Sequence, residues 1–186
     1  YIYIETIASL ISGNIFWIIM SKITTSETIG ITSTLISFAG IVSVIANIGI
    51  PAGVLRFLGR SFSEKKLDEA KKTVLVALFL ICMGITACSL TMVIVQNWIH
   101  DIFDFDLSLL LIAILFVGSA ALSMLFRSVV ISSLNTRSLP IIIIPSSIVK
   151  LILTVILLLI GTGVVGLTIG FTSAHVLTSI LLGIFV

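Results

Sequence analysis

The chain has 186 residues, of which 59% are apolar and only 10% are charged, and its mean hydropathy is +1.35. A soluble domain carries about 25% charged and about 45–50% apolar residues, so the composition argues against a soluble fold. The formal net charge of +2 is too small to indicate a nucleic-acid-binding protein.

Six apolar segments follow one another along the chain. A helix needs about 20 apolar residues to cross a bilayer core about 30 Å thick. The segments are blocks of Ile, Leu and Val without the strict alternation of a membrane β-barrel, so they predict helices. They cover residues 4–23, 29–50, 73–97, 107–134, 140–160 and 164–186. We therefore expect an all-α membrane protein with six transmembrane helices, forming a single domain over residues 1–186.

The longest polar passage, residues 56–72, separates the second and third segments and holds six of the ten Lys and Arg residues. Lys and Arg concentrate in cytoplasmic loops. In a six-span zigzag, the loop with Arg137 lies on the same side. We therefore expect a multi-pass protein of the plasma (cytoplasmic) membrane whose N-terminus and residues 56–72 are cytoplasmic.

Residues 56–72 also have the pattern of a short amphipathic helix. Ser63 is a candidate N-cap, and the acids that follow it alternate with Lys at helical spacing. Such a basic helix is expected to lie along an anionic lipid leaflet.

Two cations fall inside the predicted spans. Lys150 is ten residues past Pro140, or about 15 Å along a helix, which places it near the middle of the bilayer. Arg127 lies about 10 Å inside the cytoplasmic face by the same rise. A charge at the bilayer centre costs at least ~2.5–3.5 kcal/mol. Because Glu5 and Glu27 lie near span ends, we expect no acidic partner at similar depth for either cation.

Three interpretations of these cations stay open at this point. They bind an anionic ligand in a wet cavity, they reach lipid headgroups, or they pair with residues outside this chain.

His175 lies near the middle of the sixth segment, among several hydroxyl residues. An ionisable group at that depth is a candidate proton or polar relay. The alternative is a neutral imidazole held by hydrogen bonds from the surrounding hydroxyls.

Small residues four positions apart predict close helix contacts. These pairs are Gly49 with Gly53, Gly166 with Gly170, and Ser119 with Ser123.

No motif predicts an enzyme, a cofactor or a metal site. Cys82 and Cys88 fall on different faces of one apolar segment and are expected to be small packing residues. The sequence contains no phosphate-binding glycine loop, and one buried His does not make a catalytic triad.

Three stretches carry a resemblance to a known family. They are residues 47–60 (NIGIPAGVLRFLGR) with the basic EKKLDEAKK that follows, residues 21–38 (SKITTSETIGITSTLISF) and residues 125–158. In their order and spacing, these stretches resemble polysaccharide biosynthesis membrane proteins. That family comprises the oligosaccharide-lipid flippases of the multidrug/oligosaccharidyl-lipid/polysaccharide (MOP) superfamily.

The resemblance implies a transporter of about 12 to 14 helices in two six-helix lobes related by a pseudo-two-fold axis. This chain would be the N-terminal lobe of that MOP-like transporter. The function implied is the flipping of an isoprenoid-diphosphate-linked oligosaccharide across the cytoplasmic membrane by alternating access.

The implied partners are membrane lipids, the lipid-linked anionic sugar, and a C-terminal lobe or partner subunit that lies outside this chain. The resemblance assigns Arg127 and Lys150 to a cationic cavity, and Arg56 and Arg60 to the diphosphate at its cytoplasmic mouth. Arg clamps phosphate oxygens by charge-assisted and often bidentate hydrogen bonds.

Two other functions remain open. A cation-coupled multidrug exporter of the same superfamily needs a buried carboxylate, and none is found in residues 7–20. A non-transporting membrane subunit of a larger complex fits the small size and the small-residue pairs. The sixth segment also ends at Val186 while still apolar, so we expect the chain to be part of a longer protein.

Overall fold

The computed structural model describes residues 2–103, 105–134 and 136–184, and all regular secondary structure in these ranges is helical. The helices are α1 (Ile2–Ile23), α2 (Ser26–Asn47), α3 (Ile50–Ser63), α4 (Leu67–Ile94), α5 (Gln96–Phe103), α6 (Leu107–Ser132), α7 (Ser138–Leu159) and α8 (Gly163–Ile184). Within the described residues, six helices are long and apolar enough to cross a membrane: α1, α2, α4, α6, α7 and α8. The predicted all-helical architecture with six helices able to span a membrane is confirmed for this part of the chain.

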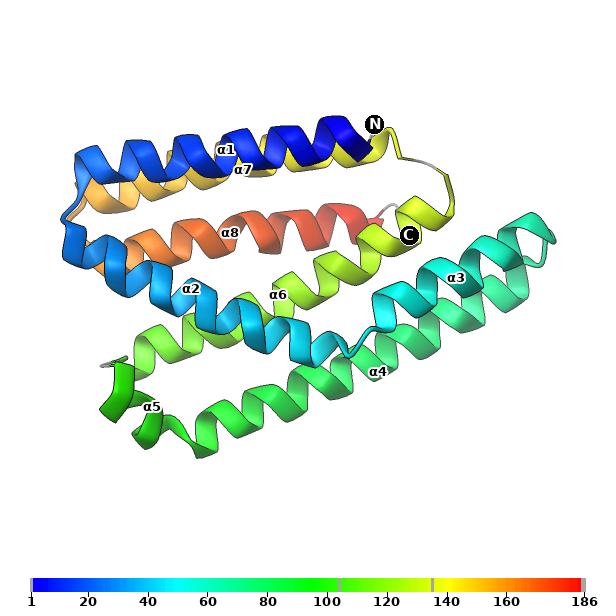
Figure 1. The fold of residues 1–186 in the computed structure, drawn as a ribbon, viewed down its shortest axis with the longest axis horizontal. Helices are drawn as coiled ribbons and strands as arrows, with labels where there is room; N and C mark the ends of the chain where they lie inside the picture. Colours follow the sequence, from blue (N-terminus) through cyan, green and yellow to red (C-terminus); the bar gives the residue numbers. More distant parts are fainter. Residues whose placement is uncertain (1, 104, 135, 185–186) are drawn as a thin grey trace.

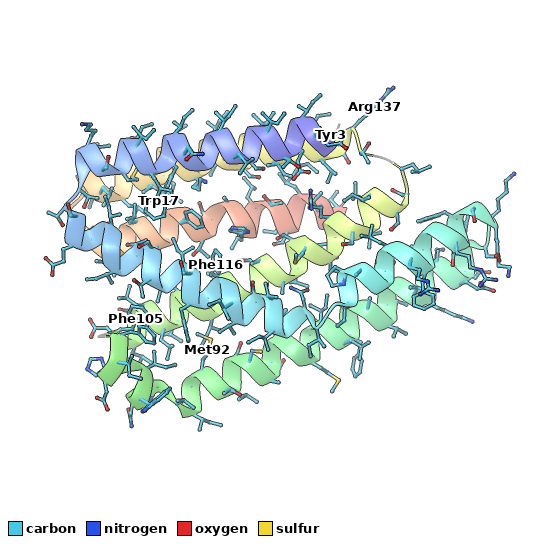
Figure 2. The ribbon with its side chains drawn as sticks, in the orientation of Figure 1. Tyr3, Trp17, Met92, Phe105, Phe116 and Arg137 are labelled. Atoms are coloured by element: carbon cyan, nitrogen blue, oxygen red, sulfur yellow. The ribbon has the colours of Figure 1, made fainter. Side chains whose placement is uncertain are left out.

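The helices run lengthwise between two ends of the molecule (Figure 1). At one end lie the N-terminus, the α3–α4 hairpin and the start of α7, while α5 and the α7–α8 connection lie at the other. Arg137 and Tyr3 share the first of these ends (Figure 2). The polar segment 56–72 and Arg137 therefore lie at the same end of the bundle, as expected for spans that alternate in direction.

Helix α6 is the centre of the bundle, because it packs against α2, α3, α4 and α8. Its buried residues on one side, including Leu110, Ala113 and Val117, join a core with α2, α4 and α5. On another side, Ala121 and Leu125 join a core with α3 and α4. A helix that is apolar on several faces suits a central position, since more than one face finds an apolar neighbour.

Helices α7 and α8 approach each other closely along the Gly166–Gly170 pair. A Cβ atom added at Gly170 would lie 2.8 Å from the Thr154 Cα atom, and one added at Gly166 would lie 3.0 Å from the Leu157 Cβ atom. The prediction of a packing role is confirmed for this pair. In lipid, such close backbone approach supplies much of the attraction between helices.

Replacing Gly170 by Ala should therefore lower the thermal unfolding midpoint in detergent, because α7 and α8 must separate to admit the methyl group. Overpacking of this kind costs about 1–3 kcal/mol. Gly30→Ala is the matched control, since a Cβ atom there meets nothing within 4 Å and Ala is favoured over Gly in a helix by about 0.5–1 kcal/mol. Equal midpoints for the two variants would contradict this account of the interface.

The second predicted span ends earlier than expected, at Asn47, because the chain turns there. Ile48 (φ 41°) and Gly49 (φ 71°) both adopt the left-handed conformation and separate α2 from α3. Gly49 is needed for this turn and not for packing, since a Cβ atom at Gly49 or Gly53 would meet nothing within 4 Å. The packing role predicted for this pair is wrong.

Residues 56–72 form a helical hairpin and not a loop with its own short helix. Ser63 was expected to begin a helix, but it is the last residue of α3, and its hydroxyl donates to the Arg60 carbonyl oxygen. Val54, Leu58 and Ser61 are the buried face of α3, which packs on α4 and α6. At about 1.5 Å per residue, the 28 residues of α4 extend beyond an apolar layer about 30 Å thick.

Glu64 holds the tip of this hairpin together. The Arg60 Nε atom lies 2.8 Å from Glu64 Oε1, and the Lys66 Nζ atom lies 2.9 Å from Glu64 Oε2. Hydrogen bonds from Arg60 and then Lys66 lower the pKa of the Glu64 carboxyl from 4.5 to about 2.

Glu64 should therefore stay ionised at pH 4, and its carboxyl should titrate well below 4.5. Because the pKa is depressed in the folded protein, the ion pairs support the hairpin above about pH 4.5 and are lost as the pH falls toward 2. A ¹³C NMR titration of labelled Glu side chains measures this, with Glu64→Gln to assign the signal. A midpoint that stays near 4.5 at low salt would contradict it, while high salt should raise the midpoint by screening.

Candidate functional site: a cavity lined by charges

A cavity of about 600 Å³ opens between five helices, with walls from α1, α2, α6, α7 and α8. Its ionisable lining residues are Glu5, Arg127, Lys150 and His175, and its hydroxyl-bearing ones are Thr6, Ser9, Ser43, Ser123, Ser146, Ser147 and Thr178. The structure thus brings together Arg127, Lys150 and His175 of the predicted site residues, from three different helices.

Arg127 is paired inside the cavity. Its Nη2 atom donates to Glu5 Oε2 across 2.6 Å, from α6 to α1. The Glu5 side chain is 7% exposed and that of Arg127 is 37% exposed. The Arg127 Nε atom is buried and has no hydrogen-bond partner among the described residues.

The expectation that no acidic side chain lies at the depth of Arg127 is therefore wrong. Glu5 was placed at a span end, yet its carboxylate and the Arg127 guanidinium reach each other across the cavity that both side chains line. A buried charge is tolerated when an opposite charge and hydrogen bonds compensate it.

Lys150 is buried and has no carboxylate partner among the described residues. The residue is 8% exposed, and among the described residues no ion pair involves it. Its Nζ atom lies 4.8 Å from the centre of the Phe16 ring and 4.9 Å from that of Phe171. Aromatic faces attract an ammonium group, by about 2 kcal/mol or more when it is desolvated.

The position of Lys150 on α7 follows a stripe with a spacing of four residues. Ile142, Ser146, Lys150 and Thr154 are all buried, and such spacing puts them on one helix face. The stripe faces α1 and α8, so Lys150 points into the protein and lines the cavity.

His175 lies on aromatic rings. Its ring centre is 4.8 Å from that of Phe116, edge to face, and 6.0 Å from that of Phe171. The hydroxyls expected to surround it mostly bond to their own helix, as Thr172 does to the Thr168 carbonyl and Ser173 to the Gly170 carbonyl. The expected hydrogen-bonded setting is not what the structure shows, and the relay role of His175 stays a prediction.

Four of the hydroxyl groups in the cavity wall donate their hydrogens to backbone carbonyls of their own helices. Ser43 donates to Gly40, Ser123 to Ala120, Ser146 to Ile142 and Ser147 to Ile143. Their oxygen lone pairs remain available as acceptors. The wall thus offers hydroxyl acceptors, while the strong donors are Arg127 and Lys150.

Arg56 and Arg60 lie outside this cavity. Both belong to α3, and both are exposed. Arg60 pairs with Glu64 and borders a separate surface groove of about 470 Å³ with Phe57, Ser61, Glu69, Lys72 and Thr73. Their role at a diphosphate entrance stays a prediction.

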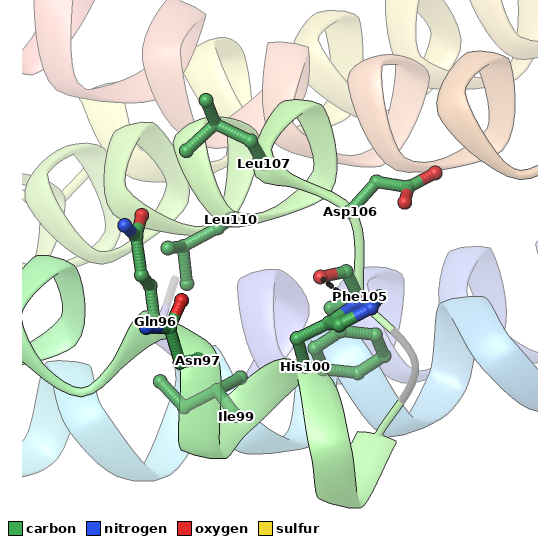
Figure 3. Close-up of a pocket in the computed structure, with 8 residues that line it drawn as sticks. All are labelled: Gln96, Asn97, Ile99, His100, Phe105, Asp106, Leu107 and Leu110. Atoms are coloured by element: carbon green, nitrogen blue, oxygen red, sulfur yellow. Dashed lines mark hydrogen bonds between the residues drawn. The ribbon is translucent and has the colours of Figure 1, made fainter.

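A smaller hollow of about 290 Å³ lies at the opposite end of the bundle, beside α5 (Figure 3). Its lining is Gln96, Asn97, Ile99, His100, Phe105, Asp106, Leu107 and Leu110, and His100 Nδ1 lies 3.2 Å from the Phe105 carbonyl oxygen. The polar side chains around it are exposed. It lacks a buried charged group, so the larger cavity is the candidate site.

Sequence reasoning missed Glu5 and the aromatic residues Phe16, Phe116 and Phe171. One signal was present: Glu5, Ser9, Ser12 and Phe16 follow one another at helical spacing, which puts the carboxylate on the polar face of α1. Its partner, 122 residues away, carried no such signal.

Comparison with known proteins adds no relative to this description. A scan against models of protein families finds no match. A search of curated proteins finds none. A search of solved structures also finds none. Among the described residues, no three His, Cys, Asp or Glu side chains are grouped so that they could hold a metal ion.

Proposed function

We propose that this chain is one lobe of a membrane transporter that flips an isoprenoid-diphosphate-linked oligosaccharide by alternating access. The observation that carries the proposal is that Arg127 and Lys150, two cations from different spans, line one intramembrane cavity. A diphosphate is a dense anion that needs such donors once it leaves water.

The chemistry of the cavity fits both parts of such a headgroup. The buried Arg127 Nε–H lacks an acceptor among the described residues, and the Lys150 ammonium lies over the rings of Phe16 and Phe171 with no ion-pair partner in that part of the chain. Phosphate oxygens supply acceptors to both. Sugar hydroxyls, in turn, donate to the four Ser oxygens whose own hydrogens are already bonded.

Replacing Lys150 or Arg127 by Ala should reduce transfer of the lipid-linked sugar about tenfold or more. A hydrogen bond to a charged group contributes ~1.5–3 kcal/mol, and 1.4 kcal/mol is a factor of ten. The measurement is the accessibility of the lipid-linked sugar to an impermeant reagent outside cells that carry the full-length protein.

Lys22→Ala is the matched control, because Lys22 is an exposed cation at the end of α1. Membrane insertion should be the same in all three variants. Wild-type transfer in both cavity variants would rule out a cationic cavity as the transport site.

A cation-coupled exporter is the second candidate, and Glu5 is the observation that favours it. A carboxylate buried in α1 beside a cavity is what such an exporter requires. Its pairing with Arg127 at 2.6 Å weighs against it, because the negative charge is already balanced. In an exporter, Glu5→Gln would abolish cation-driven efflux.

The proposed orientation places the α3–α4 hairpin in the cytoplasm. A Cys introduced at Lys66, in a chain with Cys82 and Cys88 replaced by Ala, should resist an impermeant thiol reagent in intact cells. A Cys at Lys22, near the opposite end of the bundle, should react under the same conditions. The reverse pattern of labelling would invert the topology.

A further inference from the structure

Glu5 and Arg127 form an ion pair that lines the cavity and joins two spans far apart in the sequence. Three further ion pairs lie in the α3–α4 hairpin, far from this cavity. Since Glu5 balances Arg127, Lys150 is the cation of the cavity wall that no carboxylate offsets.

An anionic ligand and the Glu5 carboxylate compete for the same guanidinium. Arg presents its five N–H donors in a planar fork that suits one bidentate partner along each edge. Glu5 now holds the Nη2 atom, while Nε remains buried and unsatisfied. A diphosphate that bonds to Lys150 and reaches Arg127 places its negative charge next to that of Glu5, and like charges at short range in a weakly polar medium repel strongly.

The first half of α1 is able to respond without disrupting the core. Tyr3 is 84% exposed, and Ile4 and Ile7 are also exposed. The helix is held by its second half, where Phe16 and Met20 are fully buried against Leu167 of α8. Loss of the Glu5–Arg127 contact therefore releases the N-terminal turns of α1 from α6 and leaves this cluster in place.

We propose that Glu5 is a resident counter-ion of the anion site, which an entering diphosphate must displace from Arg127. Displacement breaks the ion pair that links α1 to α6 across the cavity and thereby couples ligand binding to a change at the cavity wall. In the ligand-free protein, the Glu5 carboxylate compensates the positive charge of Arg127. This inference rests on the proposed function, because it takes the ligand to be a diphosphate.

Binding of two probes, inorganic pyrophosphate and farnesyl diphosphate, tests the competition in the purified full-length protein in lipid nanodiscs. Glu5→Gln removes the competing charge and keeps the shape, so it should tighten binding about tenfold. Glu5→Asp keeps the negative charge on a shorter side chain and should give a smaller gain in affinity. It is the substitute variant if Glu5→Gln proves unstable. Glu27→Gln, the loss of an exposed carboxylate at the start of α2, should bind like the wild type.

The gain from Glu5→Gln should also vanish in an Arg127→Ala background, where no guanidinium is left to compete for. A gain with both probes identifies the diphosphate as the recognised group, and a gain with farnesyl diphosphate alone shows that the lipid chain is needed as well. If both Glu5 variants bind the probes no more tightly than the wild type, the counter-ion role of Glu5 is wrong. If Lys150→Ala still weakens binding in that case, the proposed function stands.

A second measurement does not depend on a ligand. Spin labels on Cys introduced at Tyr3 and Leu134, both exposed, report the distance between α1 and the end of α6. In the ligand-free protein, Glu5→Gln should lengthen and broaden this distance, and Glu27→Gln should not. An unchanged distance overturns the counter-ion, whereas binding that is insensitive to Lys150→Ala and Arg127→Ala overturns the anion site itself.

Discussion

The compensation of charge inside an apolar medium is the constraint on which this structure depends. Glu5 and Arg127 meet at 2.6 Å across the cavity. Burying either charge without the other would be strongly destabilising. Lys150 is accommodated differently, against two neighbouring aromatic rings and beside a cavity. The cavity lies where these charged side chains converge from three helices.

Close packing elsewhere makes that cavity possible. Helices α7 and α8 meet through Gly166 and Gly170 so tightly that a single methyl group does not fit. Helix α2 approaches α4 in the same way, with the Ala46 backbone against Gly84. These contacts fix the helices that carry Ser43, Lys150 and His175, while the Glu5–Arg127 ion pair links α1 to α6 across the cavity.

The α3–α4 hairpin is a separate element with different physics. Its inner face is apolar and packs on α6, while its tip is fastened by an exposed carboxylate between two cations. Such exposed pairs contribute little stability and weaken with salt. The hairpin is therefore positioned by Val54, Leu58 and their apolar neighbours.

The sequence by itself determined the number of spans, their order and the grouping of their ends, because an apolar run of about 20 residues has one stable arrangement in a bilayer. It also identified Arg127, Lys150 and His175 as residues that need an explanation at their depth. Local turn chemistry was harder to predict, since Ile48 shares the left-handed turn with Gly49, and Ser63 ends a helix that its residue type suggested it would begin.

Only the tertiary structure decided which charges meet. The partner of Arg127 is 122 residues away, and no local pattern encodes a contact at that separation. The aromatic setting of Lys150 likewise required α1 and α8 to bring Phe16 and Phe171 together beside α7. Periodicity fixes the face on which a side chain lies, but the packing of the helices fixes what that face meets.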